Sequence, residues 1–140
     1  MRLGGIDVPA DMHCVGHSDG DAVCHALTDA LLGAAGLGDI GELYPDSDPA
    51  HAGRDSVEML AAALILVGRE RFRVANVDVT VIAERPKIGP YRAAMRDRLA
   101  AVLGVEARAV GIKGKTNEGM GWIGRGEGLA VIAVATLARG

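Results

Sequence analysis

The sequence has few cysteines and no apolar run long enough to cross a membrane. Its 140 residues include only Cys14 and Cys24, which are too few for a disulfide framework and suit a reducing compartment. No segment reaches the roughly 20 apolar residues of a membrane-spanning helix. The N-terminal segment also lacks the apolar core of a secretory signal. We therefore expect a cytoplasmic protein with no membrane partner.

Aromatic residues and excess charge are scarce as well. One Trp, two Tyr and one Phe accompany an apolar content of 49%, so the core has to be built from Ala, Val, Leu and Ile. The net charge of −3 includes no basic block, which argues against a nucleic-acid partner. An anionic small molecule remains compatible, because a site can be locally positive. The length predicts one domain over residues 1–140.

Turn-forming residues divide the chain into strands and helices. Strands are expected over 3–8, 72–83, 110–116 and 129–137, and helices over 19–35, 55–69 and about 90–104. Asp55 and Glu58 form a capping-box pattern, and Gly36 suits the end of the first helix. Neither a GxGxxG nor a P-loop fingerprint is present. The pattern predicts an α+β two-layer sandwich, with a mixed sheet of about four strands and helices on one face.

The segment His17-Ser18-Asp19-Gly20-Asp21 stands directly before the first apolar run with helical spacing. Ser18 and Asp19 are good helix N-caps. A helix that begins here would present free N–H groups, which favour an anion such as phosphate.

Three ionisable residues follow this helix start at a spacing of four. Asp21, His25 and Asp29 would share one helix face. An imidazole flanked by carboxylates is a common arrangement for a metal ligand. The alternative is a capped helix with one partly buried histidine.

Five motifs, in register along the chain, point to one family. They are His17–Asp21 followed by His25–Asp29, Gly38–Gly41, Pro45–Pro49, Arg85–Pro90 and Lys115–Gly128. From Leu3 onward the chain resembles the 2-C-methyl-D-erythritol 2,4-cyclodiphosphate synthases of the non-mevalonate isoprenoid pathway. The resemblance implies that the 2-phosphate of 4-diphosphocytidyl-2-C-methyl-D-erythritol 2-phosphate attacks the β-phosphorus, which releases CMP. Such a reaction needs no protein nucleophile; it needs positioning, metal charge and hydrogen-bond donors.

The resemblance also assigns roles to residues. His25 matches a zinc ligand, and Asp29 is a candidate partner behind it, the alternative being a solvated helix carboxylate. His17 and Thr116 match groups that stabilise the transition state. Glu118 matches the ligand of a second cation, Mg²⁺ or Mn²⁺, at the diphosphate.

The remaining assignments concern the substrate. By resemblance they are His17 and Ser18 for phosphate; Asp39, Ile40, Gly41, Tyr44, Pro45, Asp46, Ser47 and Asp48 for the methylerythritol part; Ala83, Pro86, Lys87, Ile88 and Gly89 for cytidine; Lys115, Thr116, Asn117 and Glu118 for the diphosphate; and Trp122 and Arg125. Lys115 stands where many members have threonine, which would add positive charge near the diphosphate.

The resemblance further implies a homotrimer with sites at the subunit interfaces. Metal and diphosphate residues would come from one chain, and the cytidine pocket largely from the next. Arg125 would lie near a central cavity that takes isoprenoid diphosphates. For Trp122, packing at a subunit contact is an equal alternative.

The chain departs from the family at its start. Members open with an Asp-x-His strand that completes the zinc site, whereas residues 3–9 align here with the family's second segment. The alternative alignment from Met1 would place Asp-x-Pro at that position. Asp11-Met12-His13 has the right spacing, and we interpret it as a chance match.

Two alternatives to an active synthase therefore stay open, together with one question about the context of the chain. One is a catalytically impaired trimeric protein that binds diphosphates without a complete zinc site. Another is a metal-dependent phosphohydrolase built on His17, Asp21 and His25, which would release free phosphate. Some family members are fused to the preceding cytidylyltransferase, so this chain could also belong to such a fusion.

Overall fold

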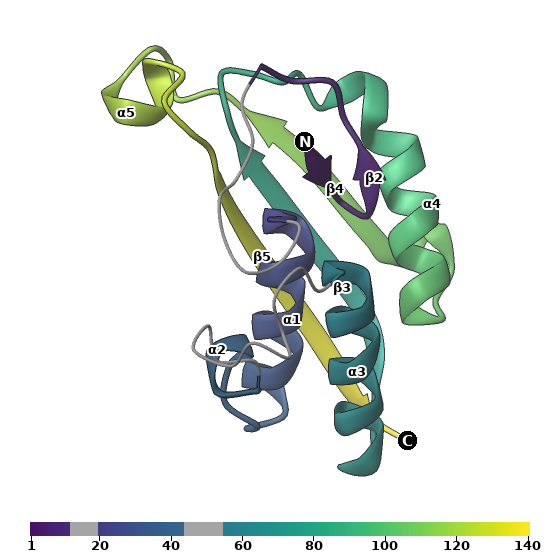
Figure 1. The fold of residues 1–140 in the computed structure, drawn as a ribbon. Coiled ribbons are helices and arrows are strands. Elements are labelled where there is room, and N and C mark those ends of the chain that lie inside the picture. Colours follow the sequence, from purple (N-terminus) through teal and green to yellow (C-terminus); the bar gives the residue numbers. More distant parts are fainter. Residues whose placement is uncertain (12–19, 44–54) are drawn as a thin grey trace.

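A three-stranded mixed sheet is the centre of the fold. The computed structural model describes residues 1–11, 20–43 and 55–140. Strands β3 (Phe72–Ile82), β4 (Val110–Lys115) and β5 (Ala130–Arg139) lie in the order β4-β3-β5 (Figure 1). β3 runs parallel to β4 and antiparallel to β5. The α+β class is confirmed, but the sheet has three strands in the described part of the chain where about four were expected.

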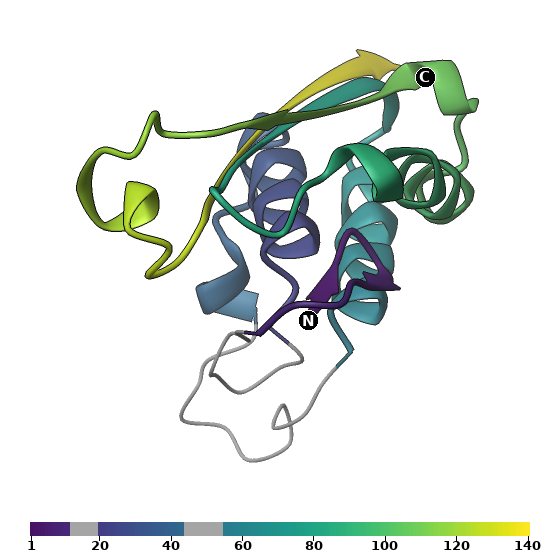
Figure 2. The same cartoon turned by 90° about the horizontal axis from the view of Figure 1, so that it is seen from above.

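Helices cover one face of this sheet (Figure 2). The long helices are α1 (Ala22–Ala34), α3 (Ser56–Arg69) and α4 (Arg92–Leu103). The described residues also form short helices, which are α2 (Ile40–Leu43), η2 (Gly89–Tyr91), η3 (Ala107–Ala109) and α5 (Gly121–Gly124). None of the described helices is long and apolar enough to cross a membrane.

The elements with the clearest sequence periodicity form where they were expected. The Asp55 carboxylate accepts the N–H of Val57 at 2.8 Å, so α3 begins directly after its predicted cap. In β3 the alternating residues Val77, Val79 and Val81 are buried against the helices. Aliphatic side chains dominate this core, as the shortage of aromatic residues predicted.

The first residues form a hairpin instead of the single strand expected over residues 3–8. β1 (Arg2–Leu3) pairs antiparallel with β2 (Ile6–Asp7). The two residues between them, Gly4 and Gly5, both have positive φ, 62° and 77°. A two-residue hairpin turn of this kind needs positive φ at both positions, which glycine adopts without strain. The expected single strand is therefore wrong.

Asp21 connects this hairpin to α1. Its buried carboxylate accepts the backbone N–H groups of Gly4, Gly5 and Cys24 at 2.9, 2.7 and 3.0 Å. Asp21 is thus the N-cap, and the helix begins at Ala22. The expected start at residue 19 is wrong; Ser18 and Asp19 themselves lie outside the described residues.

The other face of the sheet is not covered by any described element (Figure 2). Ile132 and Val134 of β5 are 58% and 60% exposed there. Beside them the Lys113 ammonium lies 2.7 Å from an Asp78 carboxylate oxygen, bridging β4 and β3. The face therefore combines apolar surface with a paired charge.

Candidate functional site

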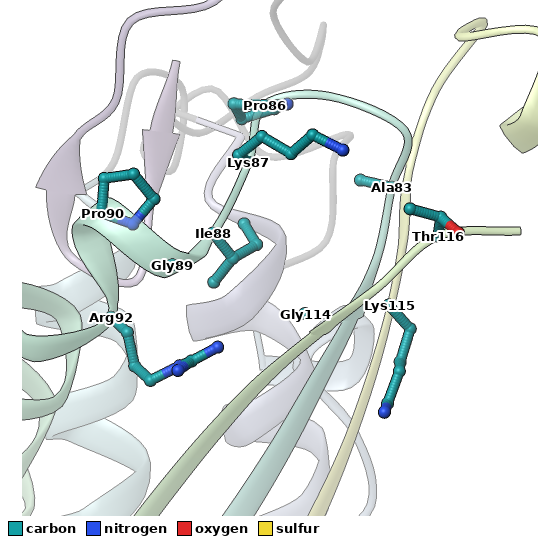
Figure 3. A pocket seen from close by; sticks show the side chains of 10 residues that line it. All are labelled: Ala83, Pro86, Lys87, Ile88, Gly89, Pro90, Arg92, Gly114, Lys115 and Thr116. Atoms are coloured by element: carbon teal, nitrogen blue, oxygen red, sulfur yellow. The ribbon is translucent and has the colours of Figure 1, made fainter.

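A cavity of about 330 Å³ opens where the loop after β3 faces the end of β4 (Figure 3). Its lining consists of Ala83, Pro86, Lys87, Ile88, Gly89, Pro90, Arg92, Gly114, Lys115 and Thr116. All five residues expected to meet cytidine are in this lining. Lys115 and Thr116, expected at the diphosphate, belong to the same cavity.

Backbone pairing and one close contact shape this cavity. The N–H of Ala83 donates to the carbonyl of Lys115 at 2.8 Å, which carries the β3–β4 pairing up to the cavity. Below it, the buried Ile88 side chain lies against Gly114. A Cβ at Gly114 would come within 2.9 Å of the Ile88 Cβ. Glycine at this position therefore lets the loop approach the strand.

Three cationic residues belong to the lining, and they point in different directions. The Lys87 side chain extends toward Ala83 and Thr116, whereas that of Lys115 extends away from them (Figure 3). Lys115 is in register with Ile82, and it alternates with Gly114, which faces Ile88. The Lys115 side chain is therefore directed away from Thr116 (Figure 3), and its expected role at the diphosphate stays a prediction.

Arg92 and Pro90 are lining residues that the sequence interpretation missed. Arg92 is the first residue of α4, and its side chain extends below Ile88 (Figure 3). Lysine and arginine side chains around a small cavity favour a ligand that carries negative charge.

The turn after β4 contains the expected Thr116 and Glu118. The Thr116 hydroxyl oxygen accepts the N–H of Glu118 at 3.3 Å, which leaves its own hydrogen to donate elsewhere. Glu118 is exposed and has a positive φ of 53°. The Asn117 amide donates to the carbonyl of Met120 at 2.8 Å, so this side chain supports the turn.

His25 lies on α1, and it is not part of the cavity lining. Its Nε2 atom is 2.9 Å from the Oγ atom of the buried Ser56, at the start of α3. Among the described residues, no three His, Cys, Asp or Glu side chains gather as a metal site would require. The predicted zinc ligand is thus described, but the described residues do not complete a zinc site.

Asp29 contacts the segment that was expected to hold methylerythritol. Its carboxylate accepts the N–H of Ile40 at 2.7 Å. Asp39 accepts the N–H of Glu42 at 2.9 Å and directly precedes α2, which begins with Ile40 and Gly41. A role of Asp29 behind His25 stays a prediction.

Several expected site residues lie outside the described part of the chain. They are His17, Ser18, Tyr44, Pro45, Asp46, Ser47 and Asp48. Trp122 and Arg125 are described, and both lie at α5. Trp122 is 50% exposed, and Arg125 donates two hydrogen bonds to the Glu127 carboxylate, both at 3.1 Å.

Comparison with known proteins gives this geometry a family. The YgbB family pattern matches residues 1–138. A 2-C-methyl-D-erythritol 2,4-cyclodiphosphate synthase of Gemmatimonas aurantiaca is 69% identical over 98% of this chain and 82% of its own length. One of Symbiobacterium thermophilum is 57% identical over 99% of this chain and 88% of its own. The chain belongs to the 2-C-methyl-D-erythritol 2,4-cyclodiphosphate synthase family.

Solved structures of synthases share the fold. A synthase in its CDP-bound form matches with a TM-score of 0.90 and 38% identity, over 99% of this chain and 89% of its own. The bifunctional IspDF of Campylobacter jejuni matches all of this chain with a TM-score of 0.96 and 41% identity; the match covers 38% of that longer protein. A nucleotide is thus a ligand of at least one synthase with this architecture.

Proposed function

We propose that the cavity between the 83–92 segment and the end of β4 receives the cytidine nucleotide of this synthase. The activity follows from family membership. It is the conversion of 4-diphosphocytidyl-2-C-methyl-D-erythritol 2-phosphate to 2-C-methyl-D-erythritol 2,4-cyclodiphosphate, in non-mevalonate isoprenoid synthesis. The observation that carries the assignment of the cavity is its lining, which joins the cytidine residues to Thr116.

The cavity has two kinds of surface, and each suits one part of the nucleotide. Ala83 and Ile88 are buried apolar residues that can pack against a planar base. Lys87 carries an exposed ammonium directed toward Thr116, where it can meet phosphate charge (Figure 3). The base would therefore lie over Ile88, with its phosphates toward Thr116.

Thr116 is the residue in this lining that can assist the transfer itself. Its hydroxyl oxygen already accepts an N–H from Glu118, and its own hydrogen stays free to donate to a phosphoryl oxygen. Charge builds on these oxygens as the β-phosphorus moves from CMP to the 2-phosphate. A donor fixed in advance stabilises that state without reorganisation.

Glu118 is suited to a divalent cation at the diphosphate. It is an exposed carboxylate two residues from Thr116, and Mg²⁺ is commonly held by one or two carboxylates together with substrate phosphates. Bound there, Mg²⁺ or Mn²⁺ would neutralise phosphate charge. Glu118 would supply the ligand oxygen from the turn that follows the lining residue Thr116.

His25 is the proposed zinc ligand, but catalytic zinc sites use three protein ligands. The described residues provide no cluster of that size. No step of the proposed mechanism is therefore assigned to zinc.

The uncovered sheet face supports a homotrimer with sites between subunits. Ile132 and Val134 expose apolar surface that a neighbouring copy would bury. His25 does not line the cavity that contains Thr116, which is compatible with a site completed by a second subunit. In such a trimer Arg125 would meet an isoprenoid diphosphate only in competition with its partner Glu127.

The test is the product formed from 4-diphosphocytidyl-2-C-methyl-D-erythritol 2-phosphate by the purified chain with Mg²⁺ and Zn²⁺. The products are measured by ³¹P NMR. Formation of cyclic diphosphate and CMP in equal amounts supports the proposal. Thr116→Val should reduce the rate about 100-fold or more, as loss of one transition-state donor does. Thr116→Ser keeps a hydroxyl and should retain most of the rate.

Other products separate the alternatives. Free phosphate without cyclic product would indicate a phosphohydrolase. CDP binding without turnover would indicate a binding protein. An unchanged rate in Thr116→Val would exclude Thr116 from the reaction.

A further inference from the structure

Glu84 lies between the two parts of the proposed site. It directly follows Ala83 of the cavity lining and is half-buried. Its Oε1 atom accepts the N–H of Asn117 at 3.0 Å and the N–H of Gly119 at 3.2 Å. A single carboxylate oxygen therefore connects the loop after β3 to the turn that contains Thr116 and Glu118.

This turn has an unusual backbone that needs support. Glu118 has φ of 53° and Gly119 has φ of 72°. For a residue with a Cβ the left-handed conformation is unfavourable in the absence of compensating contacts. The two N–H groups on either side of Glu118 both point to Glu84, while the N–H of Glu118 itself points to the Thr116 hydroxyl. The contacts of Glu84 thus hold in place the turn that contains Thr116.

We propose that Glu84 is a positioning residue, whose carboxylate oxygen holds the 116–119 turn so that the Thr116 hydroxyl and the Glu118 carboxylate face the diphosphate. Glu84 itself does not touch the substrate in this arrangement. Its role rests on the proposed function of the cavity, because the turn it supports contains the proposed transition-state donor.

Three substitutions separate geometry from charge. Glu84→Gln removes the negative charge but keeps an oxygen in place of Oε1, so both backbone N–H groups retain an acceptor. Glu84→Asp keeps the charge but is one methylene shorter and withdraws the oxygen from both donors. Glu84→Ala removes the acceptor altogether. Glu106→Ala is the matched control, because Glu106 is exposed and pairs only with Arg108 among the described residues.

The kinetic experiment measures kcat and KM for cyclic diphosphate formation. We expect Glu84→Gln and Glu106→Ala to stay within twofold of the unsubstituted chain. Glu84→Asp and Glu84→Ala should lose tenfold or more in kcat, with KM changed by less than threefold, because the base contacts remain. A rate retained by Asp and lost by Gln would overturn the proposal in favour of a charge effect. A rate within twofold for Ala would overturn it outright.

A second readout does not depend on turnover. Trp122 is the single tryptophan of the chain and the second residue of α5, three residues after Gly119. Released from Glu84, the turn should move more freely, so acrylamide quenching of Trp122 fluorescence should increase in Glu84→Ala and not in Glu84→Gln. Equal quenching in all variants would overturn the positioning role. If the unsubstituted chain forms no cyclic product, the proposed function fails while this measurement still decides the role of Glu84. Circular dichroism confirms beforehand that each variant is folded.

Discussion

The Nε2 atom of His25 lies 2.9 Å from the Oγ atom of Ser56, so α1 and α3 meet through a polar contact. Ser56 is completely buried. Buried hydrogen-bonding groups are costly to leave without a partner. This contact therefore fixes the His25 ring relative to the start of α3.

Zinc content tests the role of His25. His25→Ala should reduce bound zinc, measured by inductively coupled plasma mass spectrometry after dialysis, to the level of the buffer. The variant Asp29→Asn discriminates between the two roles of Asp29. If Asp29 orients the zinc ligand His25, the substitution should weaken zinc affinity about 10- to 100-fold. If Asp29 only accepts the backbone N–H of Ile40, the substitution should leave the zinc content unchanged. Equal zinc in His25→Ala and the unsubstituted chain would exclude His25 as a ligand.

Asp21 should be more important for stability than any other helix cap described. Its two oxygens accept three backbone N–H groups from two segments. In Asp21→Asn one oxygen becomes an NH₂ group, which leaves at least one buried N–H without an acceptor and should cost about 2 kcal/mol. Urea unfolding measures this. Asp55→Asn is the control, because Asn caps a helix as well as Asp does; an equal loss in both would contradict the special role of Asp21.

The sequence predicted the long elements well because their periodicity is local. α3 and β3 appear within one residue of their expected bounds. The hairpin at the start was missed although its signal was present, because Gly4-Gly5 between Leu3 and Ile6 is typical of a tight turn. The cap of α1 was missed for another reason. Asp21 is selected over Ser18 and Asp19 by donors 16 and 17 residues away, which no local pattern reveals.

The site was predicted by family resemblance more than by pattern. The lining brings Lys87, Ile88 and Thr116 of one chain into one cavity, whereas the resemblance implied diphosphate and cytidine residues from different chains. Arg92 was missed because the folding of α4, and no motif, brings it to the cavity. Glu84 lies inside the segment expected at cytidine, but its contacts with Asn117 and Gly119 could not be derived from the sequence. The direction of Lys115 could have been derived from strand alternation, since Ile112 and Gly114 face inward and Lys115 must then face outward.

Gly114 tests the shape of the cavity. Gly114→Ala would place a methyl group 2.9 Å from the Ile88 Cβ, so the loop has to move outward. We expect about tenfold weaker CDP binding by isothermal titration calorimetry, since overpacking of one methyl group costs about 1–3 kcal/mol and 1.4 kcal/mol is about tenfold in affinity. Gly33→Ala is the control, because nothing lies within 4 Å of that added Cβ. Equal affinity in both variants would place the nucleotide elsewhere.

Lys87 and Lys115 provide the sharpest test of how the nucleotide lies. Both line the cavity, but only the Lys87 side chain extends toward Thr116 (Figure 3). Lys87→Met should weaken CDP binding about tenfold, as the loss of one charge-assisted contact to phosphate does, and should reduce the salt dependence of binding. Lys115→Met should change the affinity by less than twofold. A larger loss of CDP affinity in Lys115→Met than in Lys87→Met would mean that the phosphates lie on the outer side of β4. Thr116 would then not be the group that the phosphates face.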